Sequence, residues 1–208
     1  MTDTPAPATM ADHWWWRPGW RPGRRFYTWH ITFAASTDVH RLAADYRQAL
    51  ADVPGLDLVP DQWLHLTMQG LGFTDEVSET DARAIADAAI RRLAKLPAFD
   101  LVLGPAITTP EALLLTARPA EPVHAVRLAL RSAITDVWPT APEPADGFRP
   151  HVSVAYSNTA GPARPASDAL AGVTSHPVTA RITAAELIVL GRDRHMYEWD
   201  TYAHASLG

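Results

Sequence analysis

A four-residue pattern occurs twice in this chain, and both copies lie in segments typical of β-strands. One copy, His-Leu-Thr-Met, begins at His65, and the other, His-Val-Ser-Val, begins at His151. Successive side chains of a strand point to opposite faces, so His65 shares a face with Thr67. In the same way His151 shares a face with Ser153. If the two strands face one another across a groove, two imidazoles and two hydroxyls surround one point.

This set of groups suits displacement at a phosphodiester. One imidazole activates the attacking oxygen as a general base, and the other protonates the departing oxygen as a general acid. The hydroxyls hold non-bridging phosphate oxygens. Histidine serves in both roles near neutral pH. The sequence therefore predicts His65 and His151 as catalytic residues, with Thr67 and Ser153 as phosphate-binding residues.

The composition indicates a folded protein with a real core. The chain has 208 residues, of which 47% are hydrophobic and 20% are charged. A formal net charge of -5 gives no broad field to attract a long polyanion, so contact with nucleic acid depends on a local patch and short or terminal substrates fit better. Because the chain has no cysteine, a disulfide framework, a thiolate nucleophile and a cysteine-ligated metal are excluded.

The first 25 residues contain no uninterrupted apolar stretch of the kind that signal peptides carry. No later apolar run is long enough to span a bilayer. We therefore expect a cytoplasmic protein without a membrane partner, and we expect a monomer.

Residues 1–24 are predicted to form an N-terminal arm ahead of a single two-lobed domain at 25–208. Residues 1–12 resemble a disordered leader, and the tandem repeat WRPGWRPG then marks successive turns. The arm holds the densest mixture of cations and aromatic rings in the chain: Arg17, Arg21, Arg24, Arg25, Trp14, Trp15, Trp16 and Trp20. Such a mixture suits phosphates and stacked bases. The alternative, which we favour as the main role, is that the arm folds back and packs its tryptophans on the domain.

Strand-like and helix-like segments alternate along the rest of the chain. Strands are predicted within 25–35, 58–73 and 148–158, with a closing pair within 180–203. Helices are predicted within 36–55, 78–96 and 121–138, and in part of 167–177. A hairpin is predicted within 99–117, and a connecting loop at 139–147. The hairpin is expected to turn at Pro110 and Glu111, and Ser78 and Thr80 are capping candidates for the second helix. This order predicts an α+β fold.

The paired motifs, the proline before the second one in FRPHVSV, and the order of elements around them resemble the 2H phosphoesterase superfamily, specifically its bacterial 2′,5′ RNA ligase branch. The resemblance covers roughly residues 25–203, and Ser153 stands where threonine is common in the family. It implies a bilobal fold in which two antiparallel sheets, with helices outside, face each other across a cleft.

The resemblance also implies a metal-independent activity on RNA termini or related nucleotides. A 2′,3′-cyclic phosphate would be opened to a 2′-phosphate, and some members also join such an end to a 5′-hydroxyl. His65 would protonate the leaving oxygen and His151 would activate the water. No cofactor and no metal are implied.

Further candidates border the same groove. Strand alternation places Trp63 and Gln69 on the face of His65, as an aromatic platform and a polar group. Arg149 shares the face of His151 and is predicted to bind phosphate, although it equally fits an exposed residue at the start of a strand. His30 and Tyr156 are added as substrate-binding candidates, and a structural role is the alternative for His30.

Other chemistries have weaker support. The chain has no H-E-x-x-H motif, no glycine-rich phosphate loop and no G-x-S-x-G elbow. Two alternatives stay open. One is a non-catalytic RNA- or nucleotide-binding module, and the other is an enzyme with the same mechanism that acts on a small cyclic nucleotide. Retention of both histidines and both hydroxyls favours catalysis, because binding alone is served as well by Arg or Lys.

Overall fold

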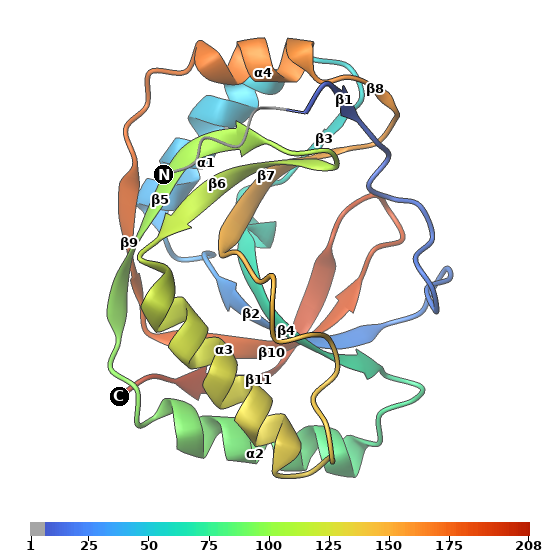
Figure 1. Cartoon of the computed structure of the whole chain (residues 1–208), viewed down its shortest axis with the longest axis vertical. Coiled ribbons are helices and arrows are strands. Elements are labelled where there is room, and N and C mark those ends of the chain that lie inside the picture. Colours follow the sequence, from blue (N-terminus) through green and yellow to red (C-terminus); the bar gives the residue numbers. More distant parts are fainter. Residues whose placement is uncertain (1–6) are drawn as a thin grey trace.

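The computed structural model describes residues 7–208, and its strands form two larger antiparallel sheets (Figure 1). The four-stranded sheet has the order β11 (Glu198–Ser206), β10 (Ala184–Gly191), β2 (Phe26–Thr32) and β4 (His65–Phe73). The five-stranded sheet has the order β3 (Leu56–Leu58), β7 (His151–Ser157), β6 (Ala112–Arg118), β5 (Phe99–Thr108) and β9 (Val178–Ile182). A short pair joins β1 (Thr9–Met10) to β8 (Gly161–Pro162). The predicted α+β fold with two antiparallel sheets is confirmed.

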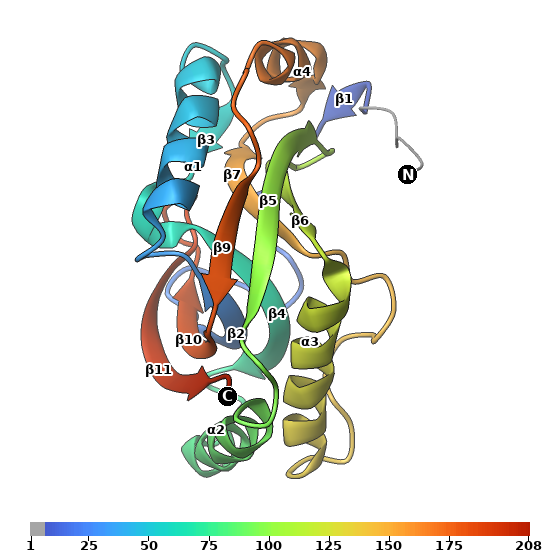
Figure 2. The same ribbon diagram turned by 90° about the vertical axis from the view of Figure 1, so that its left-hand side faces the viewer.

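Helices cover both ends of the molecule (Figures 1 and 2). They are α1 (Thr37–Leu50), α2 (Glu79–Leu93), α3 (Ala120–Thr135) and α4 (Arg164–Ala171), with a 3₁₀ turn, η1 (Asp61–Trp63), before β4. Helix α1 packs against α4 and β9, whereas α2 packs against α3 and β11. Helix α3 leaves the five-stranded sheet and packs against β4, so it ties the two lobes together. Within residues 7–208 no helix is both long and apolar enough to cross a bilayer.

Local sequence signals account for several element boundaries. The Ser78 hydroxyl accepts a hydrogen bond from the Asp81 amide at 3.0 Å, so Ser78 caps α2, whereas the other capping candidate, Thr80, lies inside the helix. The hairpin of β5 and β6 turns at Pro110 and Glu111, also as predicted, and it leaves Glu111 at its tip. Helix α1 is shorter than expected, because it ends at Leu50.

The predicted closing pair of strands is formed by β10 and β11, which pair antiparallel. The C-terminal segment differs from the prediction in one additional strand, β9, which precedes this pair. Strand β9 pairs with β5 in the other sheet, along whose length it runs in Figure 2. The last strands therefore return to the sheet that β2 began, which closes the fold.

The aliphatic residues of both motifs lie in the core. Leu66 and Met68 on β4, and Val152 and Val154 on β7, are buried. Their burial fixes which way each strand faces, because rotating either strand would expose these side chains to water. The histidine and hydroxyl of each motif are thereby directed away from the core of its own sheet.

The N-terminal arm follows the surface from one lobe to the other (Figure 1). The prediction of a disordered leader is wrong for residues 7–12, which are ordered. Strand β1 pairs with β8, and the Ala11 amide donates to the Pro110 carbonyl at 2.7 Å, so residues 7–12 lie on the domain. Residues 1–6 of that leader fall outside the described part of the chain. Trp14 is buried and its indole donates to Asp57 Oδ2 at 2.8 Å, whereas Trp15 and Trp16 are exposed.

Candidate active site

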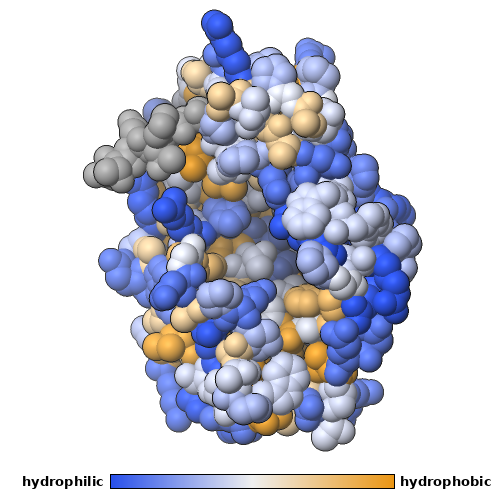
Figure 3. All heavy atoms as spheres, turned by 45° about the vertical axis from the view of Figure 1, so that its right-hand side comes forward, coloured by the Kyte–Doolittle hydropathy of each residue, from blue (hydrophilic) through white to orange (hydrophobic). Residues whose placement is uncertain are grey.

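A cavity of about 460 Å³ opens between the two sheets, in the hollowed face that Figure 3 shows. All four motif side chains line it: His65 and Thr67 come from β4, and His151 and Ser153 come from β7. The two strands that carry the motifs contact one another, one from each sheet. The structure thus brings together groups that are far apart in the chain, in the arrangement expected from alternation.

Both motif histidines are held by the same hydrogen bond. His65 Nδ1 lies 2.8 Å from the carbonyl oxygen of Trp63, and His151 Nδ1 lies 2.8 Å from that of Arg149. A carbonyl oxygen only accepts, so Nδ1 carries the hydrogen in each ring. In the neutral state Nε2 is then the basic nitrogen, and it is left available for a substrate.

The two rings differ in their surroundings. His65 is buried, and burial lowers its pKa to about 4, with a smaller lowering from the charge of His151 and an opposing effect of the Trp63 carbonyl. His151 lies at the more open side of the cleft. His65 is therefore neutral in the unliganded protein at neutral pH.

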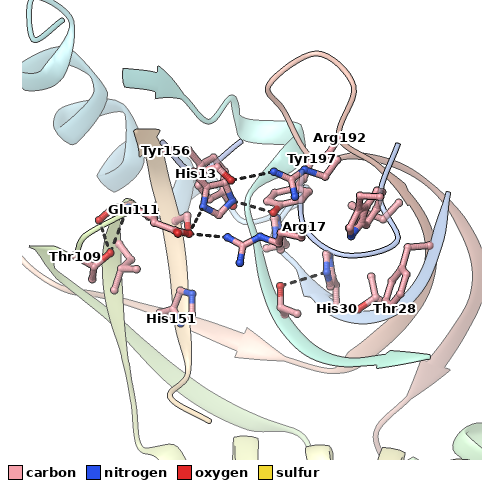
Figure 4. A pocket seen from close by; sticks show the side chains of 18 of the residues that line it. His13, Arg17, Thr28, His30, Thr109, Glu111, His151, Tyr156, Arg192 and Tyr197 are labelled. Carbon is pink, nitrogen blue, oxygen red and sulfur yellow. Dashed lines mark hydrogen bonds and ion pairs between the residues drawn. The ribbon is translucent and has the colours of Figure 1, made fainter. Parts of the chain in front are cut away.

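His30 also lines the cleft, from the strand next to β4 (Figure 4). Its ring is buried, and burial together with the charge of His65 lowers its pKa well below the ordinary range. His30 Nε2 lies 3.4 Å from the Thr67 hydroxyl. The His30 ring thus contacts the Thr67 hydroxyl and stacks on the ring of His65.

Tyr156 lines the cleft from β7 and is buried. Burial raises the pKa of its hydroxyl, with an added effect of Tyr197 and an opposing hydrogen bond with Ser153. Its ring stacks on the imidazole of His13 at 4.4 Å between centroids. Tyr156 therefore remains an uncharged phenol beside the second motif.

Two other candidates do not reach the cleft with their side chains. Trp63 belongs to η1 and not to the strand, and its ring packs against Trp199 at 4.7 Å. Arg149 is exposed and lines a separate cavity of about 700 Å³. The strand begins only at His151, so strand alternation does not fix the direction of the Arg149 side chain. Both residues contribute to the cleft through their carbonyl oxygens, which hold the two motif histidines.

Gln69 was predicted beside His65, but a bulge reverses the alternation between them. His30 pairs with Thr67 while its neighbour Trp29 pairs with Gln69, so Met68 has no partner on β2. Gln69 therefore shares the core face of Trp29 and is fully buried. Its amide donates to the Pro142 carbonyl at 2.6 Å and so fixes the 139–147 loop.

Several further residues of the cleft wall come from the arm, the hairpin tip and the segment after β10. They are His13, Arg17, Glu111, Arg192 and Tyr197. Of these, sequence reasoning had named only Arg17, among the arm cations that suit phosphates. Glu111 accepts from Arg17 Nη2 at 2.6 Å and lies 3.2 Å from His13 Nδ1. His13 Nε2 lies 2.9 Å from the Tyr197 hydroxyl. The density of Arg and Trp in the arm was the only signal in the sequence for this wall.

Comparisons with known proteins agree with this fold. A family model described as the 2′-5′ RNA ligase superfamily matches residues 35–195. No curated protein sequence matches the chain. Among solved structures, TT0787 of Thermus thermophilus is similar with a TM-score of 0.67 at 16% identity, over 88% of this chain and 97% of that one.

E. coli LigT is similar in two complexes, each of which covers 88% of this chain and 98% of the other. The complex with 3′-AMP has a TM-score of 0.66 at 19% identity. The complex with NADP⁺ has a TM-score of 0.62 at 20% identity.

Proposed function

Because the chain belongs to the 2′-5′ RNA ligase superfamily, we propose that it is a metal-independent phosphodiesterase that opens 2′,3′-cyclic phosphates at RNA ends or on nucleotides. One observation carries the proposal: His65 and His151 line a single cleft, and each has Nδ1 bound to a carbonyl and Nε2 left available. Thr67 and Ser153 line the same cleft as donors for phosphate oxygens. Two imidazoles in this state supply the base and the acid of an in-line displacement.

The proposed reaction balances without a further reagent. Water attacks phosphorus as the P–O3′ bond breaks, the basic imidazole takes a proton from the water, and the acidic imidazole gives one to O3′. The products are a 2′-phosphate and a free 3′-hydroxyl. When a 5′-hydroxyl replaces the water, the same step forms a 2′,5′ linkage, which is the ligase activity.

The low pKa of His65 bears on which ring plays which part. A neutral imidazole is the state that a base requires, and His65 is neutral in the unliganded protein because it is buried. We therefore assign His65 as the base and the more open His151 as the acid in ring opening. This reverses the assignment that the family resemblance implies. The negative charge of a bound phosphate raises the pKa of a nearby imidazole and so strengthens His65 as a base.

The nucleotides bound by E. coli LigT support the class of substrate. That protein has been solved with 3′-AMP and with NADP⁺, both of which carry a phosphate on a ribose. In this chain the cleft adds the aromatic rings of Trp20, Phe26 and Tyr156 beside the phosphate donors. Such rings suit a nucleobase.

The test uses purified protein in EDTA with a 2′,3′-cyclic mononucleotide, a 3′,5′-cyclic nucleotide, an oligoribonucleotide that ends in a 2′,3′-cyclic phosphate, and a 2′,5′-linked oligonucleotide. Turnover of the 2′,3′-cyclic ends is expected, unaffected by the chelator. Loss of activity in EDTA with recovery on adding a divalent ion would contradict the metal-independent mechanism. Tight binding of every nucleotide without turnover of any would identify a recognition module instead.

A further inference from the structure

Arg192 immediately follows β10 and lines the cleft, yet it is 3% exposed. Its Nη2 donates to the His13 carbonyl at 2.9 Å, and its Nη1 is buried without a hydrogen-bond partner. Within residues 7–208, no carboxylate lies within ion-pair distance of this guanidinium. A buried charge without a counterion is destabilising, so its presence in a cleft wall calls for an explanation.

Aromatic rings keep the guanidinium in place. Arg192 Cζ lies 5.4 Å from the ring centroid of Trp14, 5.7 Å from that of Trp20 and 5.8 Å from that of Tyr197. Faces of aromatic rings attract a cation but do not satisfy its N–H groups. The rings therefore orient Arg192 and leave Nη1 as an unused charged donor.

Arg17 brings a second guanidinium to the same cleft, from the N-terminal arm (Figure 4). Burial has the largest effect on the pKa of Arg192 and lowers it. The positive charge of Arg17 also lowers this pKa, whereas Tyr197, Glu111 and Asp12 raise it. Glu111 holds Arg17 by an ion pair at 2.6 Å, and that carboxylate is 33% exposed. Arg17 is thus paired directly with a carboxylate, whereas Arg192 keeps a charged donor, Nη1, without a hydrogen-bond partner.

We propose that Arg192 and Arg17 form a subsite for a second phosphate of the substrate, distinct from the phosphate that His65 and His151 act on. The substrate class is then a nucleotide or RNA end that carries a 5′-phosphate or 5′ phosphodiester as well as its 2′,3′-cyclic phosphate. The identity of the ligand rests on the proposed function. A phosphate oxygen accepts a hydrogen bond from Arg192 Nη1, and the negative charge of the phosphate offsets the positive charges of the two guanidiniums. Such charge-assisted hydrogen bonds are stronger than hydrogen bonds between neutral groups.

The test measures binding, so that it does not depend on turnover. Calorimetry compares adenosine 2′-monophosphate with adenosine 2′,5′-bisphosphate, neither of which holds a diester to cleave. The parent protein is expected to bind the bisphosphate on the order of tenfold more tightly, with an advantage that shrinks as salt is added. Arg192→Gln and Arg17→Gln are each expected to remove most of that ratio.

Arg194→Gln is the matched control, because Arg194 is exposed and is paired with Glu198 at 2.7 Å. It should keep the ratio of the parent. Thermal melting shows whether Arg192→Gln is folded, and if it is not, Arg17→Gln decides the result. Equal affinities of the two ligands in the parent, or a parental ratio in both variants, would overturn the proposal. A large ratio without turnover of any cyclic phosphate would leave the subsite standing and overturn the proposed function alone.

Discussion

The imidazole of His30 lies flat against that of His65, with ring centroids 4.2 Å apart and planes 4° apart. Both rings are buried, and burial lowers the pKa of each. Two stacked imidazolium ions would repel each other strongly at this distance, so at most one ring of the pair is positively charged. His30 thus forms a wall that orients His65 and favours its neutral state.

Replacing either motif histidine with alanine is expected to lower the rate on a 2′,3′-cyclic mononucleotide by about 100- to 10,000-fold, because each change removes one partner of the acid-base pair. Thr67→Val and Ser153→Ala should cost less, since proton transfer is kept and one phosphate contact is lost. Steady-state kinetics give the comparison. His176→Ala is the control, because that side chain is exposed and does not line the cleft. A His151→Ala variant as fast as the parent would show that the mechanism is wrong.

The assignment of His151 as the acid predicts a dependence on the leaving group. A nucleotide ester of p-nitrophenol releases p-nitrophenolate, a stable anion that needs no proton on leaving. A variant without the general acid should therefore recover much of its lost rate on this substrate. We expect His151→Ala to show this recovery and His65→Ala to show little. Rates of both variants on the activated and the natural substrate check the assignment, and recovery in His65→Ala alone would reverse it.

The stability of the protein should fall as the pH is lowered through the range below the ordinary histidine pKa. Burial lowers the pKa of His65 from 6.5 to about 4, so between these values the unfolded chain binds a proton that the folded protein does not. The contribution of His65 to the free energy of unfolding is fully present above the ordinary histidine pKa and is lost as the pH falls toward 4. Urea unfolding near pH 7 and near pH 5 measures it.

The matched variant for that experiment is His65→Asn, whose amide can still donate to the Trp63 carbonyl but does not titrate. Its free energy of unfolding should decline less between the two pH values than that of the parent, by roughly 1 to 2 kcal/mol. His176→Asn should decline as the parent does. Identical declines in the parent and in His65→Asn would mean that His65 titrates normally in the folded protein.

Trp14 should anchor the arm, and Trp16 should not. Trp14 is 6% exposed and donates to Asp57, so Trp14→Ala is expected to destabilise the protein by about 3–5 kcal/mol. Trp16 is 49% exposed, and Trp16→Ala is expected to stay within about 0.5 kcal/mol of the parent. Chemical denaturation distinguishes the two. Equal small effects would show that the arm adds no stability.

Local rules predicted the parts of the site that lie within one regular segment. Alternation set the shared face of His65 and Thr67 and that of His151 and Ser153, because each pair is two residues apart on an unbroken strand. Capping chemistry narrowed the start of α2 to Ser78 or Thr80, of which Ser78 is the cap, and a Pro-Glu turn placed the tip of the hairpin. These features depend on neighbouring residues, which can be read directly along the chain.

Only the tertiary structure decided the rest. Gln69 leaves the cleft because of a bulge at Met68, and a bulge exists only relative to the partner strand β2. Arg17, Glu111 and Arg192 meet at one wall because the arm crosses from lobe to lobe past the hairpin tip. The sequence by itself therefore determined the two histidine motifs and the faces they occupy. The packing of distant segments decided which cations lie beside the two motifs. Such contacts depend on the burial of the whole core and not on any local pattern.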